Sequence, residues 1–425
     1  MSLERNIAPQ FHKVKDLHFP EYQKIEIKTG IDLYAIKAGT EPVIRLDLVF
    51  NAGLTRQLKK AESSFTAQML SEGTSKKTAS ALADALDFYG AYFQTRSNAD
   101  DAIASLYCLE KHLKSCLPIF IEALVDSIFP PKELDIIRKN SIQKLLVNEK
   151  KNNYLCRKVF YQKLLGAHHP YAGFSEKADL ENLNLDDLKS FYKTNYLSGL
   201  KFLILSGNFS EITLGYIHES IKTCLLQNSI EPRGGAAIST ILGKHFVEKN
   251  DSVQSAIRIG KLSIERAHPD YRKLQLLNLI FGGYFGSRLM KNIREDKGLT
   301  YGIYSVLESF QQTSVWYIET EINTKNREQG LTEIYKELAA IRNEPIGAHE
   351  LEVAKNYMLG SFLRSLDGPF SLADRLKIII DFGLSKDYYA EFVHIINSMS
   401  PEALMAISNK YFSAENIVEV LVGKK

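Results

Sequence analysis

The chain of 425 residues lacks the features that mark several large classes of protein. Its four cysteines (Cys108, Cys116, Cys156 and Cys224) form no CxxC pair, which disfavours a disulfide framework and a cysteine-based metal site. The net charge is only +3, from 53 basic and 50 acidic residues, which disfavours a dedicated nucleic-acid binder. No apolar run reaches the length of a membrane span, and the first ten residues contain no apolar leader. We therefore expect a cytoplasmic protein with reduced thiols and no membrane or nucleic-acid partner.

Common catalytic motifs are also missing. The sequence contains no GxSxG elbow and no phosphate loop, and no two of its ten histidines have the i, i+4 spacing that places two imidazoles on one helix face for zinc. The only histidine pair, His168-His169, precedes a proline in a loop, where we expect a structural role. The acidic pairs Asp100-Asp101 and Asp186-Asp187 are expected at a loop tip and a helix start, as solvated or capping groups.

What the chain does contain is a repeat. The alternating segments that begin at Ile44 and Ile257 lie 213 positions apart (257 − 44). Each half ends with a helix, a tyrosine, a turn and an apolar strand, and the two tyrosines, Tyr196 and Tyr411, lie 215 positions apart (411 − 196). Agreement of the two offsets indicates two domains of one fold. A Pro- and Gly-containing stretch separates them, so we expect domains at 1–229 and 241–425 joined by a linker at 230–240.

Strands and helices are mixed within each half. Apolar spacing predicts helices over 62–72, 78–88, 109–128, 131–148 and 185–194 in the first half, and over 325–342, 349–366 and 370–382 in the second. Hairpins are predicted from 92–97 with 103–109, and from 300–309 with 314–322. Strands grouped in hairpins with helices between the groups predict an α+β fold. We expect two similar domains, each a mostly antiparallel sheet covered on one face by helices.

The most informative segment runs from Arg294 to Tyr301, after a glycine turn at 282–286 that opens a short amphipathic helix. The pattern places a guanidinium near a helix end and a phenol on the next strand, and such a pair can stabilise negative charge on a substrate oxygen. The spacing alone is also compatible with a structural role for both residues. Arg294 would then pair with Glu295 or Asp296 on the surface, and Tyr301 would be an ordinary strand aromatic beside Tyr304.

A family resemblance favours the first reading. Residues 282–305 resemble the second-domain signature of the M16 zinc peptidases, which include insulysin, pitrilysin and the mitochondrial processing peptidase. Residues 50–53, 70–74, 90–101 and 166–171 look like further landmarks of that family, in order along nearly the whole chain. The resemblance implies two similar αβ domains of the LuxS/metallohydrolase-like type. It also implies that Arg294 and Tyr301 face the zinc of another half and help to hold the substrate carbonyl.

The chain departs from the family at the zinc site itself. Catalytic members carry His-x-x-Glu-His before a Met-Leu-x-x-Gly-Thr stretch, which here begins at Met69. Ser64 and Gln68 stand where the resemblance places the two histidines, Ala67 replaces the general base, and Leu145 falls at the third ligand. A hydroxyl and an amide do not retain zinc as imidazole and carboxylate do. We therefore expect no metal and no cofactor in this chain, with zinc in a partner.

Loss of the zinc groups together with retention of the pair predicts an inactive subunit of a two-chain M16 metallopeptidase. Its partner would carry His-x-x-Glu-His, the two chains would enclose a peptide substrate, and Arg294 and Tyr301 would act in trans. The alternative is a structural, assembly or peptide-binding homodimer without hydrolysis. An independent enzyme with a relocated metal site is disfavoured, because the ten histidines are scattered and form no ligand cluster.

Overall fold

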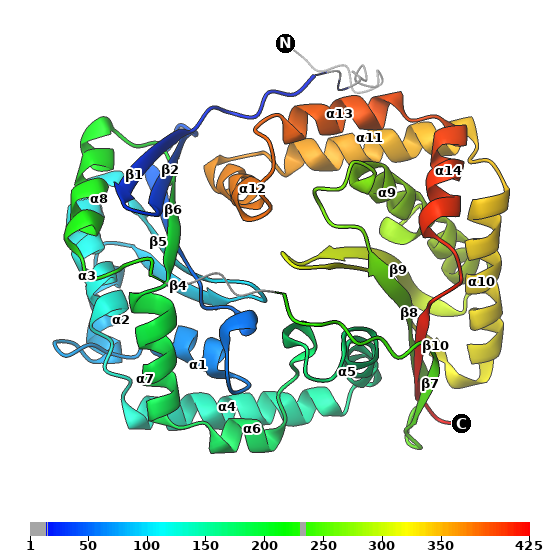
Figure 1. The fold of residues 1–425 in the computed structure, drawn as a ribbon, viewed down its shortest axis with the longest axis horizontal. Helices are drawn as coiled ribbons and strands as arrows, with labels where there is room; N and C mark the ends of the chain where they lie inside the picture. The colour runs from blue at the N-terminus through cyan, green and yellow to red at the C-terminus, as the bar shows by residue number, and fades with distance from the viewer. Residues whose placement is uncertain (1–13, 15, 230–234) are drawn as a thin grey trace, which may run out of the picture.

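The computed structural model describes residues 14, 16–229 and 235–425, so part of the predicted linker, residues 230–234, lies outside the described residues. The described chain forms two β-sheets, each flanked by helices, on opposite sides of the molecule (Figure 1). This arrangement confirms the predicted α+β fold class.

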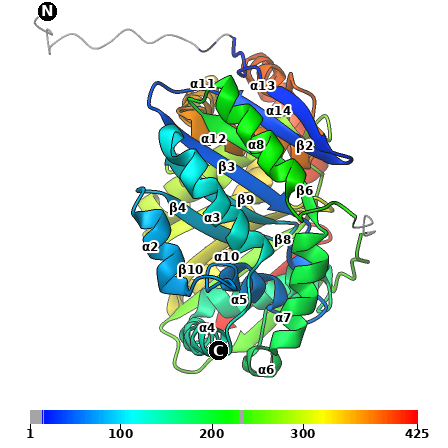
Figure 2. The ribbon, with the colours of Figure 1, turned by 90° about the vertical axis from the view of Figure 1, so that its left-hand side faces the viewer.

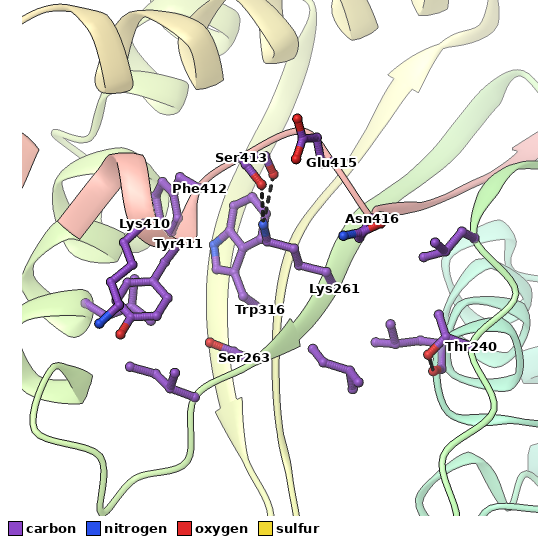
Figure 3. Close-up of a pocket in the computed structure, with 15 residues that line it drawn as sticks. Thr240, Lys261, Ser263, Trp316, Lys410, Tyr411, Phe412, Ser413, Glu415 and Asn416 are labelled. Carbon is purple, nitrogen blue, oxygen red and sulfur yellow. Dashed lines mark hydrogen bonds between the residues drawn. The ribbon is translucent and has the colours of Figure 1, made fainter. Parts of the chain in front are cut away.

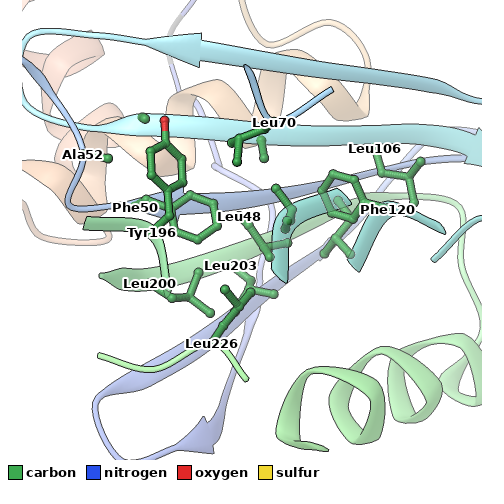
Figure 4. Close-up of a cluster of buried hydrophobic side chains, with 14 of the residues drawn as sticks. Leu48, Phe50, Ala52, Leu70, Leu106, Phe120, Tyr196, Leu200, Leu203 and Leu226 are labelled. Carbon is green, nitrogen blue, oxygen red and sulfur yellow. The ribbon is translucent and has the colours of Figure 1, made fainter. Parts of the chain in front are cut away.

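The first sheet has six strands in the order β1-β2-β6-β3-β5-β4, all antiparallel except the parallel pair β2–β6. Its strands are β1 (Gln23–Lys28), β2 (Ile31–Lys37), β3 (Val43–Phe50), β4 (Tyr92–Ser97), β5 (Ala102–Leu109) and β6 (Leu200–Gly207). The buried side chains of β3 and β6 meet those of the helices on the outer face, as Figure 4 shows for Leu48, Leu203 and Phe120. Tyr196, one of the two repeat tyrosines, is part of this core and packs 5.0 Å from Phe50, centroid to centroid.

Eight helices belong to this half of the described chain: α1 (Glu62–Met69), α2 (Ala79–Asp87), α3 (Leu113–Val125), α4 (Pro131–Glu149), α5 (Asn152–Leu165), α6 (Lys177–Asn182), α7 (Leu185–Tyr192) and α8 (Glu211–Thr223). Figure 2 shows α2, α3 and α8 in front of the first sheet, on the side away from the other half. Local sequence fixes several of their ends. Thr78 caps α2 by accepting from the amide of Ala81, and Asn184 and Asp187 form a reciprocal capping box on α7.

The second sheet has five strands in the order β7-β11-β8-β10-β9, with β7–β11 as its parallel pair. Its strands are β7 (Gly243–Glu248), β8 (Gln254–Ser263), β9 (Thr300–Ser309), β10 (Ser314–Asn323) and β11 (Val418–Gly423). Its helices are α9 (Tyr271–Asn278), α10 (Arg327–Asn343), α11 (Ala348–Arg364), α12 (Pro369–Asp381), α13 (Tyr388–Ser398) and α14 (Pro401–Tyr411), with two π-helical segments, η5 (Leu279–Gly283) and η6 (Met290–Asp296).

One helix from each half of the chain packs against the sheet of the other half. We call the face of each sheet that is turned toward the other half its inner face (Figure 1). Helix α12, from the second half of the chain, packs on the inner face of the first sheet, where Leu372 and Leu376 meet Val49 and Phe202. Helix α5, from the first half, packs on the inner face of the second sheet. Each sheet therefore carries helices on both faces, which the repeat alone did not predict.

The packing of α5 and α12 on the sheets of the opposite halves matters for the predicted domain limits. All strands of the first sheet lie between residues 23 and 207, and all those of the second between 243 and 423, among the described residues. The described end of the predicted linker runs along α5, where the amide of Ser239 donates to the carbonyl of Leu165 at 3.0 Å. The limits at 229 and 241 stay a prediction, because each half contributes a helix to the other. No helix in the described ranges is long and apolar enough to cross a bilayer.

Candidate functional site

The four positions at which the resemblance places zinc chemistry lie on α1 and α4, two helices that pack against each other. The Ser64 hydroxyl donates to the carbonyl of Ala61 at 3.1 Å, and the Gln68 amide donates to the carbonyl of Ser64 at 3.0 Å. Ala67 and Leu145 are buried, at 3% and 7% exposure. The side chains of Ser64 and Gln68 thus hydrogen-bond to nearby backbone carbonyls, and Ala67 and Leu145 are apolar.

This set of side chains does not fit zinc. Zinc sites use thiolate, imidazole and carboxylate donors, and Ser64, Ala67, Gln68 and Leu145 offer none of these. In residues 14, 16–229 and 235–425, no group of three or more His, Cys, Asp or Glu side chains is placed to hold a metal ion. We derive no metal-dependent step from this chain.

Arg294 and Tyr301 are positioned by the contact between the π-helical segments and β9. A Cβ atom on Gly282 would come within 2.7 Å of the Ser305 amide nitrogen, so glycine is needed there for η5 to approach β9. The polar core beneath this contact is fully paired: the Asn278 amide donates to the Ser305 carbonyl at 2.9 Å, and Trp316 Nε1 donates to the Ser305 hydroxyl at 2.9 Å. The base of the Arg294–Tyr301 segment is therefore held rigidly.

A β-bulge directs Tyr301 out of the sheet. Thr320 pairs with Ile303 and Ile322 pairs with Thr300, so two residues of β9, Tyr301 and Gly302, oppose the single residue Glu321. The Tyr301 side chain is 89% exposed, and β9 is the edge strand of its sheet. Tyr301 is consequently not an ordinary packed strand aromatic.

Arg294 is half-buried near the end of η6. Its guanidinium carbon lies 4.6 Å from the ring centroid of Phe285, itself 58% exposed. Within the described chain it forms no ion pair with Glu295 or Asp296. Nor does any hydrogen bond or ring contact join Arg294 to Tyr301 among those residues. Both functional groups are left available to a molecule outside the chain.

Beside Tyr301 the inner face holds a cavity of about 360 Å³. Tyr301, Tyr304 and Glu321 line it together with Arg258 of β8 and Glu319 of β10. Arg258 is 5% exposed; it forms an ion pair with Glu319, and its guanidinium lies 4.3 Å from the Tyr317 ring centroid. Burial raises the pKa of Glu321, and a hydrogen bond from the backbone of Asn153 partly opposes that rise. The cavity wall is thus polar, with one cation between two carboxylates.

The sequence patterns did not single out Arg258, although a signal was present. Arg45 and Arg258 are the second residues of the two repeated strands, 213 positions apart (258 − 45). Both are buried on the inner face of their sheet. Arg45 pairs with Asp47 at 3.0 Å and with Asp374 of α12 at 2.6 Å. Matching positions of the repeat thus place a buried arginine in each sheet, and this is the signal that could have pointed to Arg258.

The histidine and the acidic residues that the sequence analysis considered have structural roles. One prediction about them was wrong. His169 is buried, accepts from the Tyr171 amide at 3.2 Å, and has its pKa lowered by burial. Asp187 caps α7, as predicted. Asp101 was expected to be solvated, but it is 2% exposed and pairs with Lys377 of α12. The prediction failed because the partner comes from a helix 276 positions away.

Taken together, the fold and this site define a two-sheet α+β protein with no zinc-binding side chains at Ser64, Ala67, Gln68 and Leu145, and with a half-buried Arg294 and an exposed Tyr301 on its second half. Residues 182–358 match the family model described as the peptidase M16 inactive domain. Residues 182–358 thus carry a peptidase M16 inactive domain, and nearly the whole chain is similar in fold to a solved protein of that description.

Several relatives agree with that assignment. The chain is 24% identical to the "Uncharacterized zinc protease YmxG" of Bacillus subtilis over 360 residues, covering 83% of this chain and 86% of the relative. It is 25% identical to the "Non-peptidase homolog YmxG" of Helicobacter pylori over 309 residues, covering 69% and 68%. The crystal structure of a peptidase M16 inactive domain from Pseudomonas fluorescens matches with a TM-score of 0.86 at 25% identity, covering 95% of this chain and 98% of that one.

Proposed function

We propose that this chain is the non-catalytic subunit of a two-chain M16 peptidase. It completes a peptide chamber and presents Arg294 and Tyr301 to the zinc of a partner that carries His-x-x-Glu-His. The observation that carries the proposal is the contrast between two places in one chain. At the four positions that correspond to the zinc site, Ala67 and Leu145 are apolar, and Ser64 and Gln68 donate hydrogen bonds to nearby backbone carbonyls. Tyr301, in contrast, is 89% exposed on an edge strand.

The roles of the two residues follow from their chemistry. A guanidinium and a phenolic hydroxyl can both donate hydrogen bonds to an oxyanion that develops on a substrate carbonyl. Neither group has a hydrogen-bond or ion-pair partner inside the described chain, so binding an oxyanion breaks no existing polar contact. The cation–π contact with Phe285 would hold the Arg294 side chain in place without consuming its N–H donors.

The peptide itself would add to the edge strands. β4 and β9 each end their sheet, so each leaves one row of backbone groups free to pair with an extended peptide. Tyr92 on β4 is 57% exposed and Tyr304 on β9 is 46% exposed, which leaves aromatic surface beside both edges. We assign β4 to strand addition.

The test is to co-purify the chain with a catalytic partner and to measure turnover of a quenched fluorescent peptide. We expect Arg294→Ala and Tyr301→Phe each to lower kcat on the order of a hundredfold, because each removes one oxyanion donor. Lys291→Ala is the matched control, since Lys291 is an exposed cation on the same segment, and it should leave kcat unchanged. Unaltered turnover in both variants, with the complex intact by size-exclusion chromatography, would refute the role in trans.

The second candidate is a structural or peptide-binding homodimer without hydrolysis. The name of the Helicobacter relative, a non-peptidase homolog, favours it. A stable homodimer of the purified chain that recruits no His-x-x-Glu-His partner in pull-down would support this candidate over the first. The cytoplasmic location stays a prediction under either.

A further inference from the structure

A second cavity, of about 570 Å³, lies beyond the C-terminal end of β8, at the opposite end of that strand from the residues that line the Tyr301 cavity. It is enclosed by the end of β8, the connection from α14 to β11, and the chain around Thr240 and Leu242 (Figure 3). Its volume is in the range of small-molecule sites. Neither the peptide chamber nor the Arg294–Tyr301 pair requires it.

The walls of this cavity combine an apolar part with polar side chains. Leu164, Leu274 and Trp316 are buried in it, at 0%, 1% and 2% exposure. Leu242 and Leu262 also line it, yet they remain 48% and 39% exposed. Apolar surface left uncovered inside a concavity gains free energy when an apolar group covers it.

One cation lies among these walls without a counter-ion. The Lys261 ammonium donates to the carbonyl and to the hydroxyl of Ser413, both at 3.0 Å, which leaves one of its three N–H groups unused (Figure 3). No carboxylate of the described residues lies within ion-pair distance of it. Burial and the nearby positive charge of Arg342 both lower the pKa of Lys261, and Glu415 opposes them only in part.

The second ammonium on the wall is already neutralised. Lys410 pairs with Asp270 at 2.8 Å, so it has little to offer a ligand. Glu415 lines the cavity too, but it is exposed to solvent, where its repulsion of an anion is screened. A partly buried cation with an unused donor and no paired charge is unfavourable by itself, and an anion beside it would offset that cost.

We propose that this cavity binds a small carboxylate with an apolar tail. The carboxylate accepts a hydrogen bond from Lys261, and the tail covers Leu242 and Leu262. Two sources share this chemistry: a medium-chain fatty acid, and the C-terminus of a peptide that ends in apolar residues.

Trp316 makes the proposal directly measurable, because it is the only tryptophan of the chain and it lines the cavity. The full chain is titrated with octanoate and, separately, with N-acetyl-leucyl-leucine, while the Trp316 emission is followed. We expect a saturable change with at least one probe, and the tighter of the two identifies the source. Octan-1-ol should bind at least about tenfold more weakly, since it lacks the charge that Lys261 recognises.

Matched variants locate the site. Lys261→Met should weaken binding at least about tenfold, whereas Lys410→Met, which removes the other ammonium of the same wall, should bind as the unaltered chain does. Leu242→Asp changes an exposed residue and should also weaken binding, so the test survives if Lys261→Met fails to fold. Absence of a saturable change with both probes, or equal losses in Lys261→Met and Lys410→Met, would overturn the proposal.

Discussion

The contact between α12 and the first sheet includes a largely buried lysine, Lys377. Lys377 donates to Asp101 of the first half and to Asp381 one turn along its own helix. The three side chains are 17%, 3% and 9% exposed, in that order. Lys377→Met keeps most of the side-chain volume but removes the charge. It leaves two largely buried carboxylates without Lys377, and in the described ranges their remaining ion pair is the one between Lys201 and Asp381, at 3.8 Å.

Breaking a buried ion pair by removing one partner costs about 3–5 kcal/mol, because the remaining charge is left uncompensated. We therefore expect Lys377→Met to lower the free energy of unfolding by about that amount. Urea unfolding measures it, followed by Trp316 fluorescence for the second half and by far-UV circular dichroism for the whole chain. Since each sheet is covered by a helix of the other half, both probes should shift together.

The control is Lys336→Met. Lys336 also pairs with a carboxylate, Glu333 at 2.8 Å, but its side chain is 65% exposed. Such a surface pair contributes roughly 0–1 kcal/mol, so its loss should barely move the urea midpoint. If Lys377→Met costs less than about 1 kcal/mol, or no more than Lys336→Met, the reasoning about the buried pair is refuted.

The pH dependence of the same variant follows from Asp381. Burial raises the pKa of Asp381, and the charge of Lys377 partly opposes that rise. Without Lys377 the pKa of Asp381 should rise further. A carboxyl with a raised pKa binds its proton more tightly when folded, so stability falls as the pH rises from the ordinary value of about 3.9 through the raised one. The deficit of Lys377→Met should therefore be smaller in mildly acidic solution than above neutrality.

Two further predictions concern glycine and metal. Gly282→Ala should destabilise the chain by about 1–3 kcal/mol in urea unfolding, because the new Cβ meets Ser305. Gly360→Ala, inside α11 with nothing near its Cβ position, should instead stabilise it by roughly 1 kcal/mol, and equal effects would contradict the argument. The purified chain should hold far less than one zinc per molecule by elemental analysis, and a chelator should not change its urea midpoint. Stoichiometric zinc together with peptidase activity of the isolated chain would contradict the reading of Ser64, Ala67, Gln68 and Leu145.

Local pattern predicted the elements whose neighbours are close in sequence. The hairpin predicted at 92–97 and 103–109 is β4 with β5, and the helix predicted at 131–148 is α4, which ends one residue later. Alternation and turn residues suffice there, since the interacting residues are only a few positions apart. The predicted short helix after the glycine turn exists as well, but it is π-helical through η6. Helix propensity and apolar spacing do not distinguish a π-helix from an α-helix.

The exchange of α5 and α12 could not be predicted in the same way. Helix α5 was not among the predicted helices, although Cys156, Phe160 and Leu164 have the spacing of one helix face. The sheet that this face covers lies about a hundred residues further along the chain, and Asp374 reaches Arg45 across 329 positions. Contacts of that range depend on the assembled fold and not on a window of sequence. The same limit explains the error about Asp101.

The two buried arginines, Arg45 and Arg258, have different surroundings on the two inner faces. Helix α12 brings a carboxylate, Asp374, to Arg45, and the ring of Phe370 lies 5.7 Å from its guanidinium, so this charge is closed off. At the matching place α5 brings the thiol of Cys156 and the ring of Phe160, and the carboxylate that pairs with Arg258, Glu319, comes from its own sheet. The Arg258 Nη1 atom has no hydrogen-bond partner among the described residues, and its cavity is shared with Tyr301. That cavity lies beside Tyr301, one of the two residues that we propose act in trans, so Arg258 is the buried cation that a ligand near Tyr301 would meet on this face.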